Sequence, residues 1–138
     1  MRWTLPEPRE REEFALLLMR TVVGSFLVWG VWDNIIDEAH MATFVAFLGD
    51  HGFPVPEVAA RLSVVAQFSC GVAFLSGAFV RWAGLLCAAN FIVAIAMVDY
   101  KLGLRGMFPA ASLVAIGLYL AARGGGRFAL DARLERRR

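Results

Sequence analysis

The sequence holds few side chains that could do chemistry, and most of them lie inside or just beyond long apolar runs. The polar candidates are Asp33, Asn34, Gln67, Asn90, Asp99 and Tyr100, and the aromatic candidates are Trp29 and Trp32. Amide groups can donate hydrogen bonds to the carbonyl oxygens of a quinone head group, and carboxyl groups can pass protons to water. These residues predict a quinone-binding or other ligand-binding site beneath an aromatic rim.

A structural interpretation of the same residues stays open beside this one. An amide buried among apolar groups costs several kcal/mol unless it finds a partner. Gln67 lies six residues beyond Arg61, which is about 9 Å further along a helix, and Asn90 lies near the middle of the third run. Either amide could join two helices through a hydrogen bond, and Asp33 or Asp99 could pair with a nearby cation.

Several other chemistries are disfavoured by what the sequence contains. A membrane haem usually needs axial histidines within the spans, but His40 and His51 both lie in the first connection. Electron transfer from thiols needs paired cysteines, whereas Cys70 and Cys87 are single and in apolar surroundings. Metal-ligand spacing, P-loop and dinucleotide-binding motifs are not evident. We expect no covalently bound cofactor and no metal, and a quinone is the one cofactor that the residues favour.

The elements that position these residues follow from the composition. Hydrophobic residues make up 59% of the 138, charged residues 19%, and the mean hydropathy is +0.60. Soluble domains carry about 25% charge, and a helix crosses a bilayer with about 17 to 25 apolar residues. The sequence predicts an all-α fold, a four-transmembrane-helix antiparallel bundle, in one integral membrane domain (1–138). The expected spans are 14–36, 58–80, 82–99 and 106–122, with tails at 1–13 and 123–138.

The connections predict how the bundle is joined. In the first one, apolar residues recur with helical spacing at Met41, Phe44, Val45 and Leu48. We expect a short interfacial helix there, ending near residues 49–52. Spans two and three are separated in this segmentation by Arg81 alone, which predicts a tight hairpin. Small residues spaced by four, which can mark close helix contacts, are Ala73 with Gly77, Gly84 with Ala88, and Ala111 with Ala115.

The basic residues predict the orientation. If both tails lie inside, that side carries all of the 14 Lys and Arg residues except Arg61, Lys101 and Arg105. Positively charged loops are retained in the cytoplasm, so we expect both tails in the cytoplasm and a multi-pass protein of the bacterial inner membrane. Membrane lipids are its expected partners, and nucleic acid is not. Arg20, inside the first run, is expected to extend its side chain outward to the membrane surface.

The order of these features resembles the DoxX family of small bacterial four-helix membrane proteins. The resemblance rests on an apolar first span, the turn at Gly52-Phe53-Pro54, the glycine-flanked stretch 67–77 and the closing residues 124–131, which read Gly-Gly-Gly-Arg-Phe-Ala-Leu-Asp. It covers most of the chain, from about residue 20 to residue 131. Two departures stand out: family members often carry Glu at the position of Gln67, and a His-Gly pair near Val31-Trp32.

The resemblance implies a role beside redox enzymes. Named members are membrane subunits of quinone-linked oxidoreductases, including thiosulfate:quinone and terminal quinol oxidase assemblies, or partners of oxidative-stress enzymes. It implies an accessory or anchor subunit that is not catalytic alone and needs a partner carrying the redox centre. Two alternatives stay open: a stand-alone binder or carrier of a lipid or other hydrophobic molecule, and a purely structural subunit of a larger membrane complex.

Overall fold

The computed structural model describes residues 8–138, and this part of the chain is helical without strands. The elements are α1 (Pro8–Ile36), α2 (Glu38–Asp50), α3 (Pro56–Ser76), α4 (Val80–Met97), the short 3-10 turn η1 (Asp99–Leu102), α5 (Gly103–Arg123) and α6 (Leu130–Glu135). Four of the helices, α1, α3, α4 and α5 with η1, are long and apolar enough to cross a membrane. The predicted all-α, four-span fold is confirmed.

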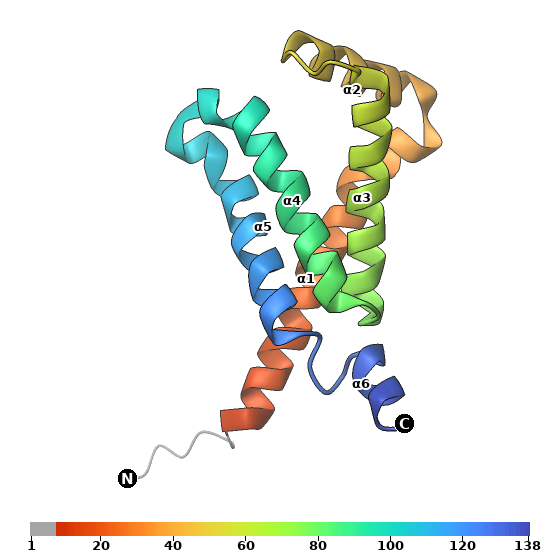
Figure 1. Ribbon diagram of the computed structural model, residues 1–138, viewed down its shortest axis with the longest axis vertical. Helices are drawn as coiled ribbons and strands as arrows, with labels where there is room; N and C mark the ends of the chain where they lie inside the picture. The colour runs from red at the N-terminus through yellow and green to blue at the C-terminus, as the bar shows by residue number, and fades with distance from the viewer. Residues whose placement is uncertain (1–7) are drawn as a thin grey trace.

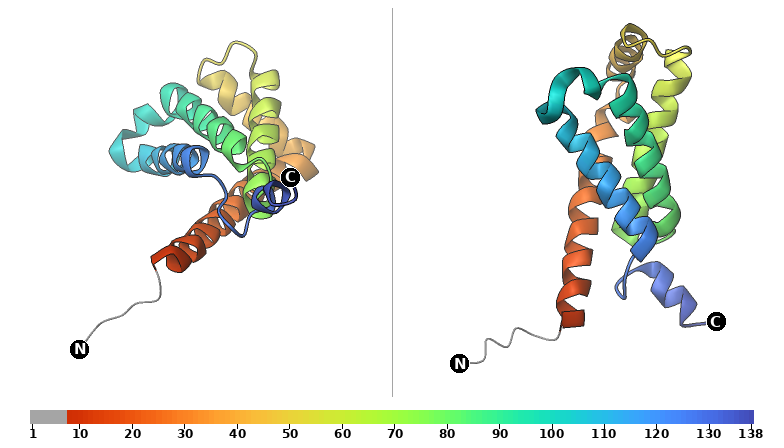
Figure 2. Two further views of the ribbon diagram at one scale, coloured as in Figure 1. Left: turned by 60° about the horizontal axis from the view of Figure 1, so that its bottom comes forward. Right: turned by 60° about the vertical axis from the view of Figure 1, so that its left-hand side comes forward.

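The four long helices run side by side along the length of the molecule (Figures 1 and 2). Both ends of the described chain lie at one end of the bundle, which we call the tail end, and α2 lies across the opposite end, the α2 end. Packing is closest within two pairs, α1 with α3 and α4 with α5, and α3 also packs against α4. In Figure 1 the two pairs diverge toward the α2 end.

The buried side chains form two separate cores. The first, toward the tail end, draws residues from all four long helices: Leu16, Val23, Leu27, Cys70, Phe74, Val80, Ala83, Cys87, Leu113 and Leu120. The second, toward the α2 end, draws on α1, α2 and α3 only: Val31, Met41, Leu48, Ala60 and Val64. The pair α4–α5 therefore shares a core with the rest of the bundle at one end and leaves it at the other.

Each helix pair crosses where two glycines meet. A Cβ at Gly71 of α3 would lie 2.8 Å from the backbone oxygen of Gly24 of α1, and a Cβ at Gly117 of α5 would lie 2.7 Å from that of Gly84 of α4. No side chain fits at such a separation, so the missing Cβ atoms let the backbones approach, as is common between membrane helices. The expected contact of Gly84 and Ala88 with a neighbouring helix is confirmed. Ala111 and Ala115 are exposed instead.

Helix ends differ from the expected spans at two places. α1 begins at Pro8, so residues 8–13 continue the helix, while residues 1–7 of the expected tail lie outside the described residues. The hairpin turn lies at residues 77–79, where Gly77 and Phe79 have positive φ angles, and Arg81 belongs to the first turn of α4. The apolar run continues through this turn, so hydropathy alone placed its centre too far along the chain.

Arg20 does not extend to the membrane surface, and that expectation was wrong. Its side chain is 1% exposed, Nε donates to the backbone oxygen of Phe74 at 2.9 Å, and Nη1 donates to that of Gly125 at 2.6 Å. The last turn of α3 and the segment after α5 bring two carbonyl groups to the guanidinium. Satisfied donors make burial tolerable, because the charged group exchanges water for backbone oxygens.

The closing residues 124–131 join the helices at the tail end. The carboxylate of Asp131 accepts hydrogen bonds from the backbone N–H groups of Phe79 (2.8 Å) and Val80 (3.0 Å), the first donors of α4. These N–H groups have no partner within their own helix, so the carboxylate caps α4 from a distant part of the chain. Gly77 leaves room for Ala129, whose Cβ would be 2.8 Å from any Cβ at residue 77.

Candidate functional site

A cavity of about 660 Å³ lies at the α2 end, between α2 and the two helices α3 and α4. This volume is in the range of small-molecule sites, which is about 300 to 1,000 Å³. Aromatic and aliphatic side chains form most of its wall, among them Phe44 and Phe47 of α2, Phe53 and Phe91. The cavity lies where the two helix pairs diverge. Because the pairs share no core at this end, a space large enough for a small molecule remains between them.

A chain of hydrogen bonds forms the polar part of the wall. Gln67 Nε2 donates to Ser63 Oγ at 3.1 Å, and Ser63 Oγ donates to Asn90 Oδ1 at 3.0 Å. All three side chains are partly buried and line the cavity. With its oxygen taken by Ser63, the Asn90 amide keeps its N–H donors for a hydrogen-bond acceptor in the cavity.

The same chain of hydrogen bonds connects α3 with α4. The bond from Ser63 to Asn90 crosses between these helices, so both amides have partners without any ligand. Gln67 and Asn90 can therefore join the helices and also bind a ligand. Side chains that hydrogen bonds hold in position can still offer their remaining N–H donors to a molecule in the cavity.

The structure brings three of the predicted site residues together. Gln67, Asn90 and Asp99 all line the cavity, with Asp99 at the end of α4 where η1 begins. Its carboxyl group is partly buried and lies at the α2 end of the cavity. Of the two predicted acids, Asp99 lines the cavity and Asp33 does not.

The other predicted residues lie elsewhere on the α2 end. Asn34 donates to the backbone oxygen of His40 at 3.3 Å and so ties α1 to α2, while Asp33 is exposed. Trp29 is 81% exposed and Trp32 43% exposed on α1, and the Tyr100 ring lies 5.6 Å from Lys101 Nζ. These five residues do not line the cavity. The two tryptophans face the membrane surroundings, as is common near an interface.

Two contributions to the cavity were not predicted. Ser63 lies four residues before Gln67, which places both on one face of α3, so its role as a bridge could have been found from spacing. The aromatic wall from α2 could not, because the helical spacing of Met41, Phe44, Val45 and Leu48 shows a shared face but not its neighbour. Met41 and Leu48 are buried in the core with residues of α1 and α3, and Leu48 lines the cavity together with Phe44 and Phe47.

At the beginning of α2, the carboxylate of Asp37 is held in its charged form. Asp37 caps α2: Oδ1 accepts from the backbone N–H of Ala39 at 2.9 Å, and Oδ2 lies 2.9 Å from His40 Nδ1. The hydrogen bond with His40, then that with Ala39, holds the pKa of Asp37 below its usual range. Among the described residues, no three His, Cys, Asp or Glu side chains are grouped closely enough to hold a metal ion.

The family model for DoxX matches residues 15–99. The chain belongs to the DoxX family. No curated protein and no solved structure matches it. Every residue that lines the α2-end cavity, from Phe44 to Asp99, falls within the DoxX match, whereas the closing segment at residues 124–131 follows it. As a DoxX member with four long apolar helices, the chain is a multi-pass membrane protein whose surface meets lipid.

Proposed function

We propose that this DoxX member is an accessory subunit of a quinone-linked membrane oxidoreductase and that its α2-end cavity receives the quinone head group. The observation that carries the proposal is the hydrogen-bonded chain of Gln67, Ser63 and Asn90 on the wall of an otherwise apolar cavity. Asn90 donates to a quinone carbonyl, the phenylalanines surround the ring, and Asp99 relays from water, one after the other, the two protons that accompany reduction to the quinol.

The redox centre belongs to a partner in this proposal. A quinone accepts two electrons and two protons to become a quinol. The four spans contain no histidine that could hold a haem as the source of these electrons. The electrons must come from a protein that carries the cofactor, and this chain holds the quinone and supplies a proton path. We further propose that both tails face the cytoplasm of a bacterial inner membrane, which places the cavity toward the outer leaflet.

Quinone binding is tested by titrating the purified chain with ubiquinone-2, a short-chain quinone, and measuring the bound fraction by native mass spectrometry. Ser63→Ala removes the bridge and is expected to weaken binding about five-fold, since a hydrogen bond is worth about 1 kcal/mol. Asn90→Leu removes the donor and is expected to weaken it further. The matched control is Ser25→Ala, which changes an exposed serine of α1 away from the cavity. Equal affinity in all four proteins would contradict a quinone at this wall.

The partner is tested separately by purifying the tagged chain from its own membranes in mild detergent and identifying stoichiometric companions by mass spectrometry. A companion that carries a flavin, haem or iron–sulfur cluster is expected. Gln67→Leu should retain that companion but lower quinone reduction by the complex. Loss of the companion in this variant would show that Gln67 serves assembly and not the ligand.

A stand-alone binder of a hydrophobic molecule is the second candidate. The observation that favours it is that every residue lining the cavity comes from one chain, from α2, the loop at Phe53, α3, α4 and the residues 98–99 that follow it. In this case the same amides hold the polar head of a lipid-like molecule, and no electron is transferred. Purification of the chain alone with a bound lipid in the cavity, together with no affinity for ubiquinone-2, would support this candidate over the first.

A further inference from the structure

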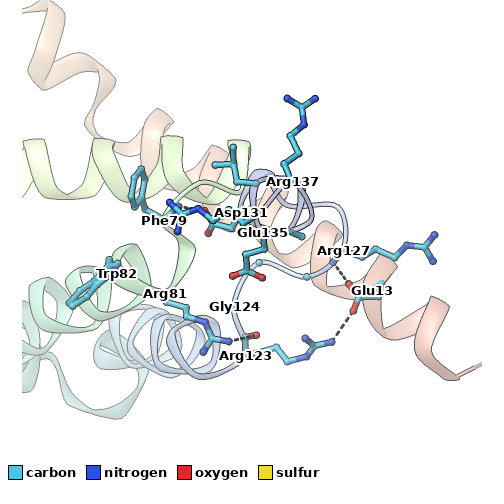
Figure 3. Close-up of a pocket in the computed structure, with 15 residues that line it drawn as sticks. Glu13, Phe79, Arg81, Trp82, Arg123, Gly124, Arg127, Asp131, Glu135 and Arg137 are labelled. Atoms are coloured by element: carbon cyan, nitrogen blue, oxygen red, sulfur yellow. Dashed lines mark hydrogen bonds and ion pairs between the residues drawn. The ribbon is translucent and has the colours of Figure 1, made fainter.

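A second cavity lies at the tail end, far from the site described above. Its volume is about 920 Å³, and it lies between the beginning of α4, the end of α5, the glycines at 124–126 and α6 (Figure 3). Five arginines and three acids contribute to its lining, so positive charges exceed negative ones by two. A cavity of this size and charge has the properties of a site for an anion.

Two of the three acids are already occupied by protein donors. Glu13 accepts from Arg123 Nη2 at 2.9 Å and from the backbone N–H of Arg127 at 2.6 Å (Figure 3). Asp131 caps α4 through two backbone N–H groups. Glu13, together with Glu12 at 3.1 Å from Arg123 Nε, neutralises Arg123, and Asp131 satisfies the beginning of α4. They leave the other arginines of the cavity without an acidic partner among the described residues.

Arg81 is a fixed cation in this cavity. Its Nη1 donates to the backbone oxygen of Ala122 at 2.7 Å, and Nη2 lies 3.4 Å from that of Arg123, so the end of α5 orients the guanidinium. Nε takes part in no hydrogen bond among the described residues. A Cβ at Gly124 would lie 3.3 Å from Nε and 3.4 Å from Nη2, so the glycine leaves this side of the guanidinium uncovered. Nε and Nη2 together form the edge with which arginine binds phosphate.

The cavity also has an apolar border. Phe79 is 74% exposed and Trp82 is 73% exposed, and both line the cavity on the side of α4 (Figure 3). Tryptophan favours the boundary between hydrocarbon and head groups, and basic pockets beside transmembrane helices bind anionic lipid heads. Exposed aromatics beside an oriented guanidinium thus match a molecule with an anionic head and apolar chains better than an acidic protein.

We propose that this cavity binds the phosphate head group of an anionic phospholipid, with Arg81 on the phosphate and Phe79 and Trp82 along the acyl chains. Arg127 and Arg137 add positive charge at the border of the site, and in Figure 3 both extend outward. The inference does not rest on the quinone proposal, because it concerns other residues at the opposite end of the bundle.

Glu135 allows a test of whether the cavity prefers a negatively charged head group. Its side chain lines the cavity and makes no hydrogen bond or ion pair among the described residues. In Figure 3 it extends toward the space between Arg81 and Arg123. A carboxylate there repels a phosphate, so Glu135→Gln should strengthen the preference for an anionic lipid. A site for a head group that carries an ammonium would respond in the opposite way.

The experiment uses the fluorescence of Trp82, which lines the cavity, to detect which lipid lies beside it. In a full-length variant with Trp3, Trp29 and Trp32 changed to Phe, quenching of Trp82 fluorescence is measured in phosphatidylcholine vesicles containing dibrominated phosphatidylglycerol. The reverse labelling, with bromine on phosphatidylcholine at the same composition, gives the relative association constant of the two lipids. We expect a several-fold preference for phosphatidylglycerol. Arg81→Gln should lower it about five-fold, the effect of about 1 kcal/mol per basic residue.

The controls distinguish the cavity from a general attraction of basic residues to the membrane. Arg105→Gln, which removes an exposed arginine at the α2 end, should leave the preference unchanged. If Arg81→Gln does not fold, Glu135→Gln still decides, because its side chain holds no other group. Equal affinity for the two lipids, or no change in either cavity variant, would overturn the proposal. So would loss of the preference on adding 10 mM inorganic phosphate at constant ionic strength, since this would assign the site to free phosphate.

Discussion

At the scale of single residues, Arg20 shows how a side chain can be misread from its position in the chain. A cation one or two turns inside an apolar run is expected to extend outward, because water is close. Here the guanidinium is buried, since backbone oxygens of Phe74 and Gly125 replace water. Gly125 is 105 residues away, so no local pattern reveals this partner.

Arg20→Met should destabilise the folded bundle. The change leaves two buried carbonyl groups without their charged donor, and each such hydrogen bond contributes about 1.5 to 3 kcal/mol. We expect a fall of about 2 kcal/mol or more in the free energy of unfolding, measured as a lower Tm in dodecylmaltoside micelles. Thr21→Val is the matched control, because that exposed hydroxyl bonds only to Leu17 of its own helix. A Tm equal to that of the control would show that the guanidinium is not needed for the tail-end core.

The carboxyl of Asp37 should titrate below its ordinary range of about 4. Hydrogen bonds from His40 and Ala39 lower its pKa, so its contribution to holding α2 is present above the unfolded value. That contribution is lost as the pH falls through the lower, folded pKa. The amide proton shift of Ala39 in micelles, followed by NMR from pH 6 to pH 2.5, should have its midpoint below the ordinary value. A midpoint at or above it would contradict the N-cap, and Asp37→Asn should abolish the titration.

At the scale of elements, hydropathy located the four long helices and helical spacing located α2, but neither located the turns. The end of the helix in the first connection could be predicted because Gly52 and two prolines follow it. The α3–α4 turn was not, because Gly77, Ala78 and Phe79 are as apolar as the helices beside them. The helix contacts at glycines were predicted only in part. Gly84 belongs to a pair of small residues spaced by four, whereas the contact between Gly24 and Gly71 was not predicted.

Gly84→Ala should weaken the α4–α5 pair. The new methyl group would overlap the backbone oxygen of Gly117 and lie 2.7 Å from the backbone nitrogen of Ala121, and backbone atoms cannot move aside cheaply. Overpacking of this kind costs about 1 to 3 kcal/mol. Gly30→Ala is the matched control, because a Cβ there meets nothing within 4 Å and alanine favours the helix. We expect a lower Tm for the first variant and an unchanged or higher one for the second.

At the scale of the whole molecule, the fold class and the shared end of the first and last described residues followed from four apolar runs. The candidate site followed only in part, since Gln67, Asn90 and Asp99 meet in a cavity whereas Asp33, Asn34 and Tyr100 lie outside it. The difference depends on how the helix pairs diverge, which is set by the two cores. A list of polar residues at one depth carries no information about which helices separate and which stay packed.

Labelling of single cysteines tests the orientation. In a background with Cys70 and Cys87 changed to Ala, Asp50→Cys at the end of α2 should react with a membrane-impermeant maleimide on intact cells. Arg133→Cys in α6 should react only after permeabilisation. Both positions are exposed, so accessibility within the protein does not decide the outcome. The reverse pattern would place the α2-end cavity toward the cytoplasm and overturn the proposed direction of the site.

The bond from Arg20 to Gly125 has a consequence for the order in which the protein is made. The carbonyl group is translated 105 residues after the guanidinium, which is about 5 to 20 seconds later at ordinary rates of synthesis. During this interval the chain from α1 to the end of α5 is translated while the arginine of the first span lacks its Gly125 partner. The buried hydrogen bonds of Arg20 are therefore completed only after α5 has been translated, when the Gly125 carbonyl becomes available.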